Sequence, residues 1–405
     1  MNKRCLSIFM AVLLVIGLCA CNSDTSSSHN YYTTAVETTQ NTTTPDIKTT
    51  TETTLPAESA TQQTAAVNQS DDEYDDYISQ MSLEEKVGQL FLARCPDTDA
   101  VETAQKYHLG GYILFGSDFK DKTKAQVTST IKSYADSQDI KMLIATDEEG
   151  GTVVRVSSNP NLRSKPFLSP TDTYNAGGWQ AIEDDASEKA DLLLSLGVNV
   201  NMAPVCDVTS DPNAFMYYRS FSSNADSQSK YVQKVVSISK SKKLGTVLKH
   251  FPGYGNCADT HTGIAYDKRP YSDFENSDFK PFQKGIESGA DCILVSHNIV
   301  ECMDKNMPAS LSENVHKIIR DTLNFDGVIM TDDLSMEAIT DFTDSEAAAV
   351  TAVKCGNDLL CCTDIETQYP SVLSAVKSGE ISESSINSSV KRILKWKYNL
   401  GIFNF

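Results

Sequence analysis

Short apolar and β-branched runs alternate with longer amphipathic stretches over residues 71–405. Helical periods occupy the intervals, as in Gln180–Leu196, Lys230–Lys242, Val315–Leu323 and the terminal Glu383–Tyr398. Strands that alternate with helices favour a parallel sheet, and eight such units at this length favour an α/β fold of the (β/α)₈ barrel type. A doubly wound open sheet is the alternative on pattern alone. The predicted strands are Val87–Leu92, Gly111–Phe115, Met142–Thr146, Val198–Ala203, Thr246–Lys249, Cys292–Ser296, Val328–Thr331 and Asp358–Cys362.

The beginning of the chain follows a different pattern. Basic residues at positions 3 and 4 precede an apolar run over residues 6–18, which is too short to span a bilayer as a mature helix. Residues 1–20 are therefore interpreted as a signal peptide. The run closes with Leu18-Cys19-Ala20-Cys21, which resembles a bacterial lipobox. The resemblance implies that Cys21 becomes the lipidated N-terminus, and a signal peptide cleaved without lipid is the simpler alternative.

Residues 21–70 lack the apolar content of a folded domain. Ser and Thr supply 21 of the 49 residues from 22 to 70, and such a segment cannot bury enough apolar surface to offset its ordering entropy. We interpret it as a disordered tether that holds one catalytic domain, residues 71–405, away from a membrane.

The net charge and the cysteine positions limit the partners and metal sites that are expected. The chain carries a net charge of −19, and the first 70 residues hold 3 basic and 5 acidic residues, so −17 remains for the domain. A nucleic-acid partner is therefore not expected, and a neutral substrate is easier to accommodate. No CxxC or mixed Cys/His spacing follows Cys21, which argues against disulfides or a metal site. The adjacent Cys361 and Cys362 lie in an apolar run, where they cannot face the same side, and buried free thiols are favoured.

Polar residues collect where the predicted strands end. The third strand is followed by Asp147-Glu148-Glu149, the fifth ends in Lys249-His250, and the seventh is followed by Asp332-Asp333. In a (β/α)₈ barrel these strand ends and the following loops form the active site. A buried strand tip is a costly place for carboxylates unless they have a function.

Two segments carry a family resemblance. One is residues 249–255, Lys-His-Phe-Pro-Gly-Tyr-Gly, followed by Asp259-Thr260-His261; the other is residues 327–336, Gly-Val-Ile-Met-Thr-Asp-Asp-Leu-Ser-Met. Together they resemble the acid/base loop and the nucleophile strand of glycoside hydrolase family 3, and its single-domain β-N-acetylglucosaminidase branch in particular.

The resemblance implies catalytic roles for three residues. Asp332 is expected to be the nucleophile, with Asp333 as the competitor that would instead cap the next helix. Asp259 and His261 are expected to form an acid/base dyad on a mobile loop, because an extended loop would direct both side chains the same way. The loop is about one residue shorter than in common family members, and Thr260 stands where Ser is frequent.

The resemblance also implies substrate-binding residues. Asp147 opens a segment with Glu148 in place of the family's Gln, and Thr152 replaces a sugar-contacting arginine that the family carries. His297 is as compatible with a satisfied core position as with a ligand role, and Glu148 and Glu149 are alternative acids if the dyad fails. The expected binding set is Asp147, Arg155, Arg219, Lys249 and His250.

These residues predict a retaining exo-β-N-acetylglucosaminidase that acts on muropeptides or chitooligosaccharides. We expect a monomer without a cofactor, anchored by lipid outside the cytoplasm. A phosphorylase or β-glucosidase of the same family is the close alternative, and a sugar-binding lipoprotein is the non-enzyme alternative. A metal hydrolase would need His-x-His or His-Glu-x-x-His, and the sequence contains neither.

Overall fold

The computed structural model describes residues 70–257 and 259–405. Every element below belongs to the compact unit Val67–Phe405. The predicted signal peptide, Cys21 and the tether up to residue 69 lie outside the described residues. The first described helix, α1 (Asp71–Gln80), begins directly after its N-cap residue Ser70.

Eight parallel strands form one sheet in the order β10-β1-β2-β3-β4-β5-β7-β9. A parallel bridge between Met330 and Leu359 joins the two outermost strands, and the Leu359 N–H donates to the Ile329 carbonyl at 3.1 Å. The sheet therefore closes on itself as the predicted barrel, and the open-sheet alternative is wrong. The strands are β1 (Phe91–Arg94), β2 (Gly111–Leu114), β3 (Leu143–Thr146), β4 (Val200–Asn201), β5 (Gly245–Phe251), β7 (Cys292–Val295), β9 (Val328–Thr331) and β10 (Leu360–Cys362).

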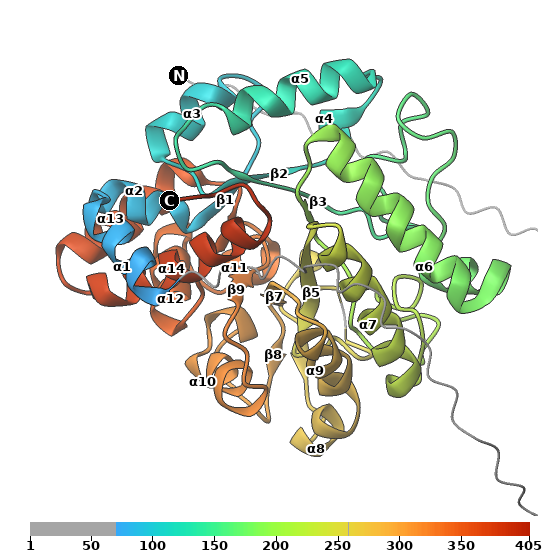
Figure 1. The fold of residues 1–405 in the computed structure, drawn as a ribbon. Helices are drawn as coiled ribbons and strands as arrows, with labels where there is room; N and C mark the ends of the chain where they lie inside the picture. Colours follow the sequence, from blue (N-terminus) through green and yellow to red (C-terminus); the bar gives the residue numbers. More distant parts are fainter. Residues whose placement is uncertain (1–69, 258) are drawn as a thin grey trace, which may run out of the picture. The chain divides into compact units, whose positions relative to one another are not determined.

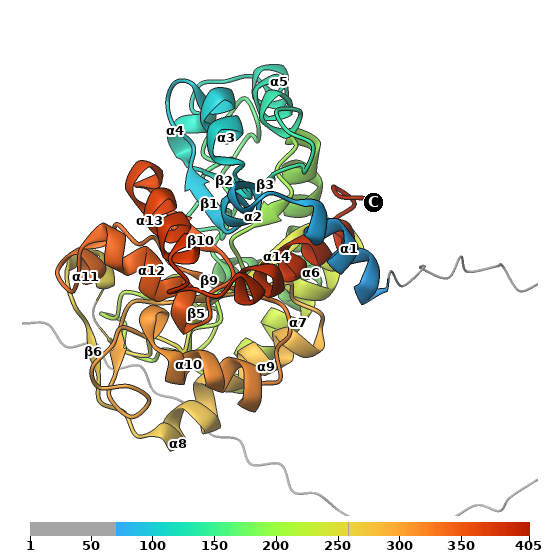
Figure 2. The same cartoon turned by 90° about the vertical axis from the view of Figure 1, so that its left-hand side faces the viewer.

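Helices surround the strands in both ribbon views (Figure 1, Figure 2). Several begin at polar caps whose side chains accept a backbone N–H, such as Asn224 before α7 and Ser382 before α14. Short helices and a two-stranded pair, β6 (Tyr266–Asp267) and β8 (Ile299–Val300), belong to the connecting loops. The longer helices are α2 (Leu83–Gln89), α3 (Ala100–Tyr107), α5 (Lys124–Ala135), α6 (Pro170–Leu196), α7 (Ala225–Ser241), α9 (Phe279–Glu287), α10 (Glu313–Lys317), α12 (Ser345–Cys355), α13 (Ile365–Lys377) and α14 (Glu383–Asn399).

Two predicted elements differ from the structure. The predicted strand Val87–Leu92 begins too early, because Val87–Gln89 closes α2 and β1 starts at Phe91. A capping box between Ser82 and Glu85 starts this helix, and both its helical end and the following strand are buried, so apolarity alone could not separate them. The predicted helix Val315–Leu323 is α10 followed by a π-helical turn, Ile318–Thr322.

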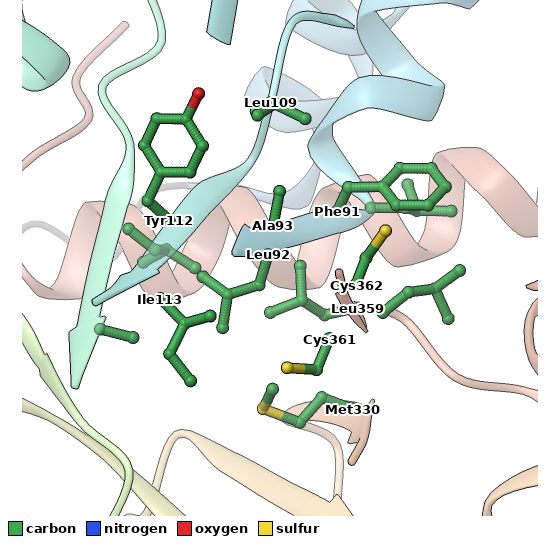
Figure 3. Close-up of a cluster of buried hydrophobic side chains, with 14 of the residues drawn as sticks. Phe91, Leu92, Ala93, Leu109, Tyr112, Ile113, Met330, Leu359, Cys361 and Cys362 are labelled. Atoms are coloured by element: carbon green, nitrogen blue, oxygen red, sulfur yellow. The ribbon is translucent and has the colours of Figure 1, made fainter. Parts of the chain in front are cut away.

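The core consists of buried apolar side chains from the strands and from the helices around them. Figure 3 shows part of it, and the thiols of Cys361 and Cys362 point in different directions there. Both cysteines are buried and free, as predicted, and their adjacent positions on β10 place them on opposite faces of the sheet. Over residues 70–257 and 259–405, no helix has the length and apolar character of a transmembrane span.

Candidate active site

A cavity of about 790 Å³ opens among the carboxyl ends of the strands and the loops that follow them. All eight residues that the sequence assigned to the catalytic domain's site line this cavity. Strand ends supply four of them, the loops after β3 and β4 supply the two arginines, and the loop after β5 supplies the dyad. They are Asp147, Arg155, Arg219, Lys249, His250, Asp259, His261 and Asp332.

A buried ion network occupies one side of the cavity. The Lys249 Nζ lies 2.6 Å from Asp147 Oδ1 and 2.7 Å from Glu149 Oε1. Arg219 binds the Glu149 carboxylate with two nitrogens, Nε at 3.0 Å and Nη2 at 2.7 Å. Arg155 lies farther away, with its Nη2 3.9 Å from Asp147 Oδ2. Positive and negative charges alternate in this network, so it can orient the hydroxyls of a neutral sugar.

The charges of this network hold one another ionised. Burial would raise the pKa of Glu149, but Lys249 and Arg219 outweigh burial and keep it well below its ordinary value. Burial would also lower the pKa of Lys249, and the carboxylates of Asp147 and Glu149 reverse that effect, so the pKa is raised. Both side chains of the Lys249–Glu149 pair are only 3 % exposed. The network is therefore charged before any substrate arrives.

His250 is held in one orientation by Asp207. The Asp207 Oδ2 accepts both the His250 Nδ1–H at 2.8 Å and the His250 backbone N–H at 3.1 Å. The other ring nitrogen lies 3.2 Å from Arg219 Nη2, where it accepts an N–H. Asp207 was not among the predicted site residues, although it lies just after the fourth strand. Its position there was the signal that could have identified it.

Glu149 is the second residue that sequence reasoning did not place in the binding set. Its neighbour Glu148 is fully buried and accepts the backbone N–H groups of Arg155 at 2.9 Å and Val156 at 2.7 Å, together with the Ser157 hydroxyl. Glu148 does not line the cavity, whereas Glu149 does. The carboxylates of the two alternative acids are thus already engaged, that of Glu148 in hydrogen bonds and that of Glu149 in ion pairs.

Asp332 follows β9 directly and presents its carboxylate to the cavity. Its backbone N–H donates to the Val295 carbonyl at 3.0 Å, and its Oδ1 accepts the Asp333 N–H at 2.9 Å. Burial would raise the pKa of Asp332, but the nearby His297 and His250 and the Asp333 N–H lower it below its ordinary value. The carboxylate is therefore ionised, as a nucleophile must be.

Asp333 also lines the cavity, but both of its carboxylate oxygens accept hydrogen bonds from neighbouring side chains or backbone. Oδ1 accepts the Ser335 backbone N–H at 2.9 Å and the Ser335 hydroxyl at 2.8 Å, and Oδ2 accepts the Thr363 hydroxyl. His297 is a satisfied core residue, with bonds to the Ser310 hydroxyl at 2.7 Å and the Asp333 carbonyl at 2.9 Å. Burial lowers the pKa of this histidine.

Asp259 and His261 lie on a tight turn rather than on the extended loop that the sequence suggested. Asp259 caps the 3₁₀ turn Thr260–Thr262, and its Oδ1 accepts the His261 backbone N–H at 2.9 Å and the Nδ1–H at 2.7 Å. The predicted pairing of the two side chains is present, but it arises from a tight turn and not from an extended loop. The bond at Nδ1 leaves Nε2 to exchange a proton with a ligand in the cavity. The ring of Phe215 lies 5.9 Å from the imidazole.

The described residues contain no group of three or more His, Cys, Asp or Glu side chains arranged to hold a metal ion. The groups that face the cavity are an ionised carboxylate, an imidazole held by Asp259 and a charged network suited to hydroxyls.

Comparisons with known proteins agree with this geometry. The family model described as the glycosyl hydrolase family 3 N terminal domain matches residues 82–396. A beta-hexosaminidase from Hydrogenovibrio crunogenus is 28 % identical over 325 residues, which cover 75 % of this chain and 88 % of that protein. Beta-hexosaminidase LpqI from Mycobacterium tuberculosis is 29 % identical over 339 residues, covering 78 % of this chain and 83 % of that protein.

A solved structure has the same fold. The glycoside hydrolase family 3 β-N-acetylglucosaminidase from Paenibacillus sp. FPU-7 superposes with a TM-score of 0.74 at 29 % identity. The match covers 80 % of this chain and 63 % of that longer chain.

Proposed function

The chain belongs to glycosyl hydrolase family 3, and from this premise we propose that it is a retaining exo-β-N-acetylglucosaminidase, that is, a β-N-acetylhexosaminidase. One observation carries the proposal: a single cavity joins an ionised strand-end carboxylate, Asp332, to an imidazole held by Asp259. The names of the relatives support an acetamido sugar as the substrate.

In the proposed reaction, Asp332 attacks the anomeric carbon while His261 donates its Nε2 proton to the leaving oxygen. The C–O bond to the leaving group breaks, and a bond from Asp332 to the sugar forms. His261 then removes a proton from water, which attacks the same carbon and releases Asp332. Two inversions give net retention. Asp259 is the residue that holds the imidazole tautomer and stabilises its positive form.

The ion network supplies the binding half of the proposed site. Asp147, Arg155 and Lys249 offer charged acceptors and donors to the hydroxyls of one terminal sugar. Muropeptides and chitooligosaccharides both present such a terminal sugar, and the natural aglycone is left open between them.

A panel of aryl β-glycosides with and without the 2-acetamido group tests the substrate. We expect the N-acetyl-β-glucosaminide to be hydrolysed faster than the glucoside, and the first sugar released to keep the β-configuration in a proton NMR time course. An equal or reversed preference would defeat the substrate assignment. An α-sugar as first product would defeat the covalent mechanism.

We further propose that Cys21 is lipidated and that residues 21–70 tether the domain to the outer face of a membrane. The lipobox-like sequence at residues 18–21 supports this. Cys21→Ala should move the protein from the membrane fraction to the medium, or leave its leader uncleaved. Lipid anchoring by two or three chains at one cysteine is stable, whereas one chain is marginal. Unchanged membrane retention of the variant would contradict the proposal.

A further inference from the structure

The turn that carries Asp259 and His261 has one inward-facing residue. Among residues 256–257 and 259–264, Thr260 is the only buried one, and it is fully shielded from solvent. The side chains on either side of it are exposed by 28 % for Asp259 and 57 % for His261. Whatever holds Thr260 in place therefore holds both dyad residues in place.

Thr260 is bonded to a tyrosine. The Tyr254 hydroxyl lies 2.5 Å from the Thr260 Oγ1, and both residues are buried. Burial raises the pKa of Tyr254, so its hydroxyl stays protonated. One of the two hydroxyls donates to the other, so removal of either one takes away this partner of the other.

Tyr254 is itself fixed to the binding half of the cavity. Its backbone N–H donates to Asp207 Oδ1 at 2.8 Å, and its ring meets the His250 ring edge-on at 5.3 Å. It also packs with Val205 and Met216 in a small apolar cluster separate from the main core. Glycines on both sides of it, Gly253 and Gly255, have φ values of 117° and 53°, which let the chain turn around the tyrosine.

We propose that Tyr254 and Thr260 form a latch that positions the dyad turn against the side of the cavity that holds the ion network. The proposal rests on the proposed function, because it assigns the latch to the delivery of the His261 proton. The two latch residues are positioning residues and do not touch the substrate. Loss of the bond leaves a buried hydroxyl without its partner, so the turn moves, and a displacement of about 1 Å at an acid can cost on the order of 100-fold in rate.

The test compares Tyr254→Phe, Thr260→Val, their double variant and Thr260→Ser. On a natural disaccharide, we expect kcat/KM to fall by about 10- to 100-fold in each single variant. On an aryl glycoside with a good leaving group, the fall should stay below about 3-fold, since such a substrate needs little protonation. The double variant should be no slower than the slower single variant, because both remove the same bond. Thr260→Ser keeps the hydroxyl and should recover most of the rate lost in Thr260→Val.

Tyr112→Phe is the matched control for losing a buried tyrosine hydroxyl. The Tyr112 hydroxyl donates to the Ala100 carbonyl at 2.7 Å, and Tyr112 does not line the cavity. It should lose stability to a similar extent as Tyr254→Phe and keep the wild-type ratio between the two substrates. A general effect of a destabilised fold would alter both variants alike.

A readout independent of activity comes from Cys257, which lies in the same loop. Its backbone N–H donates to the Tyr254 carbonyl at 2.9 Å, and burial raises the pKa of its thiol to about 12. Alkylation of Cys257 by iodoacetamide, followed by peptide mass spectrometry, should be several-fold faster in both latch variants. The exposed Cys302 is the internal reference, and its rate should not change.

The outcomes separate the latch from the proposed function. If the wild-type enzyme hydrolyses acetamido sugars but the single variants slow both substrates equally, or leave Cys257 unchanged, the latch is wrong and the function stands. Additive losses in the double variant would also overturn the latch. If the wild-type protein hydrolyses no acetamido sugar while the variants still expose Cys257, the positional link stands and the catalytic function fails.

Discussion

The two sides of the cavity are built in different ways. On one side, Lys249 and Glu149 are almost fully buried, and each has two charged partners. On the other, Asp259 and His261 are substantially exposed and are bonded mainly to each other. The binding side is formed by strand ends and by the loops after β3 and β4, and the proposed acid/base side by a capped turn in the loop after β5. A sugar can thus be oriented by a preorganised surface, while the proton donor is carried by a short turn beside it.

Because the two sides differ in burial, substitutions on them should differ in their effects on stability and activity. Removing one member of a buried ion network leaves an uncompensated charge, which costs folding free energy. Removing an exposed histidine costs little folding free energy, because solvent already reaches it. Variants on the binding side should therefore lose stability and binding together, whereas variants of the exposed dyad residues should lose activity alone.

The largest effect is expected for Asp332→Ala. The proposed nucleophile has no substitute, so kcat should fall by at least about 10⁴-fold, the scale seen when a covalent nucleophile is deleted. Circular dichroism and sugar binding by calorimetry should be nearly unchanged. Asp333→Ala is the control, because that carboxylate is hydrogen-bonded to Ser335 and Thr363. A dead Asp333→Ala enzyme beside an active Asp332→Ala enzyme would reverse the assignment.

Replacement of the His261 imidazole should lower activity without lowering stability. His261→Ala should slow a natural disaccharide by about 10²- to 10⁴-fold and an activated aryl glycoside much less, since only the former requires the proton. Added azide should restore part of the second step, because it needs no general base. Asp259→Asn should give a weaker version of the same pattern. The melting temperature should stay within the error of the wild type. Wild-type rates on the disaccharide would eliminate the dyad.

Removal of a charge from the buried ion network should lower both stability and sugar binding. Glu149→Gln leaves Arg219 and Lys249 with one carboxylate fewer, and the free energy of unfolding should fall by about 3 kcal/mol, measured by urea denaturation. The value of KM for the sugar should rise in parallel. Glu337→Gln is the matched control, because Glu337 lines the same cavity but is exposed. Equal stability of the two variants would show that the two sides of the cavity do not differ as described.

The smallest expected effect is the change with pH of the contribution that Glu149 makes to stability. The folded-state pKa of Glu149 lies below its unfolded value, so its stabilising contribution is complete above the unfolded pKa of about 4.3 and is lost as pH falls through the folded value. The difference in melting temperature between the wild type and Glu149→Gln should thus be constant near pH 7 and shrink as the pH falls below about 4. A difference that grows on acidification would contradict the sign of this shift.

The local sequence determined the positions of most strands and of several site residues. Seven of the eight predicted strands overlap the observed ones closely, because buried parallel strands are short apolar runs that end at polar residues. The same rule put Asp147, Lys249, His250 and Asp332 at the mouth of the barrel, where the structure has them. The motif spacing identified the Asp259–His261 pair, since two residues so close along the chain can meet in either an extended segment or a turn.

Only the tertiary structure decided which side chains meet across the barrel. The sequence places Glu148 and Glu149 side by side, yet one is bonded to the backbone of residues 155–157 and the other to Arg219 and Lys249. The bonds of Asp207 to His250, and of Tyr254 to Thr260, also depend on how separate strands and loops come together. Periodicity reports how each residue relates to its neighbours along the chain. Charge pairing and latch contacts depend on distances set by the closed barrel, and these do not follow from local pattern.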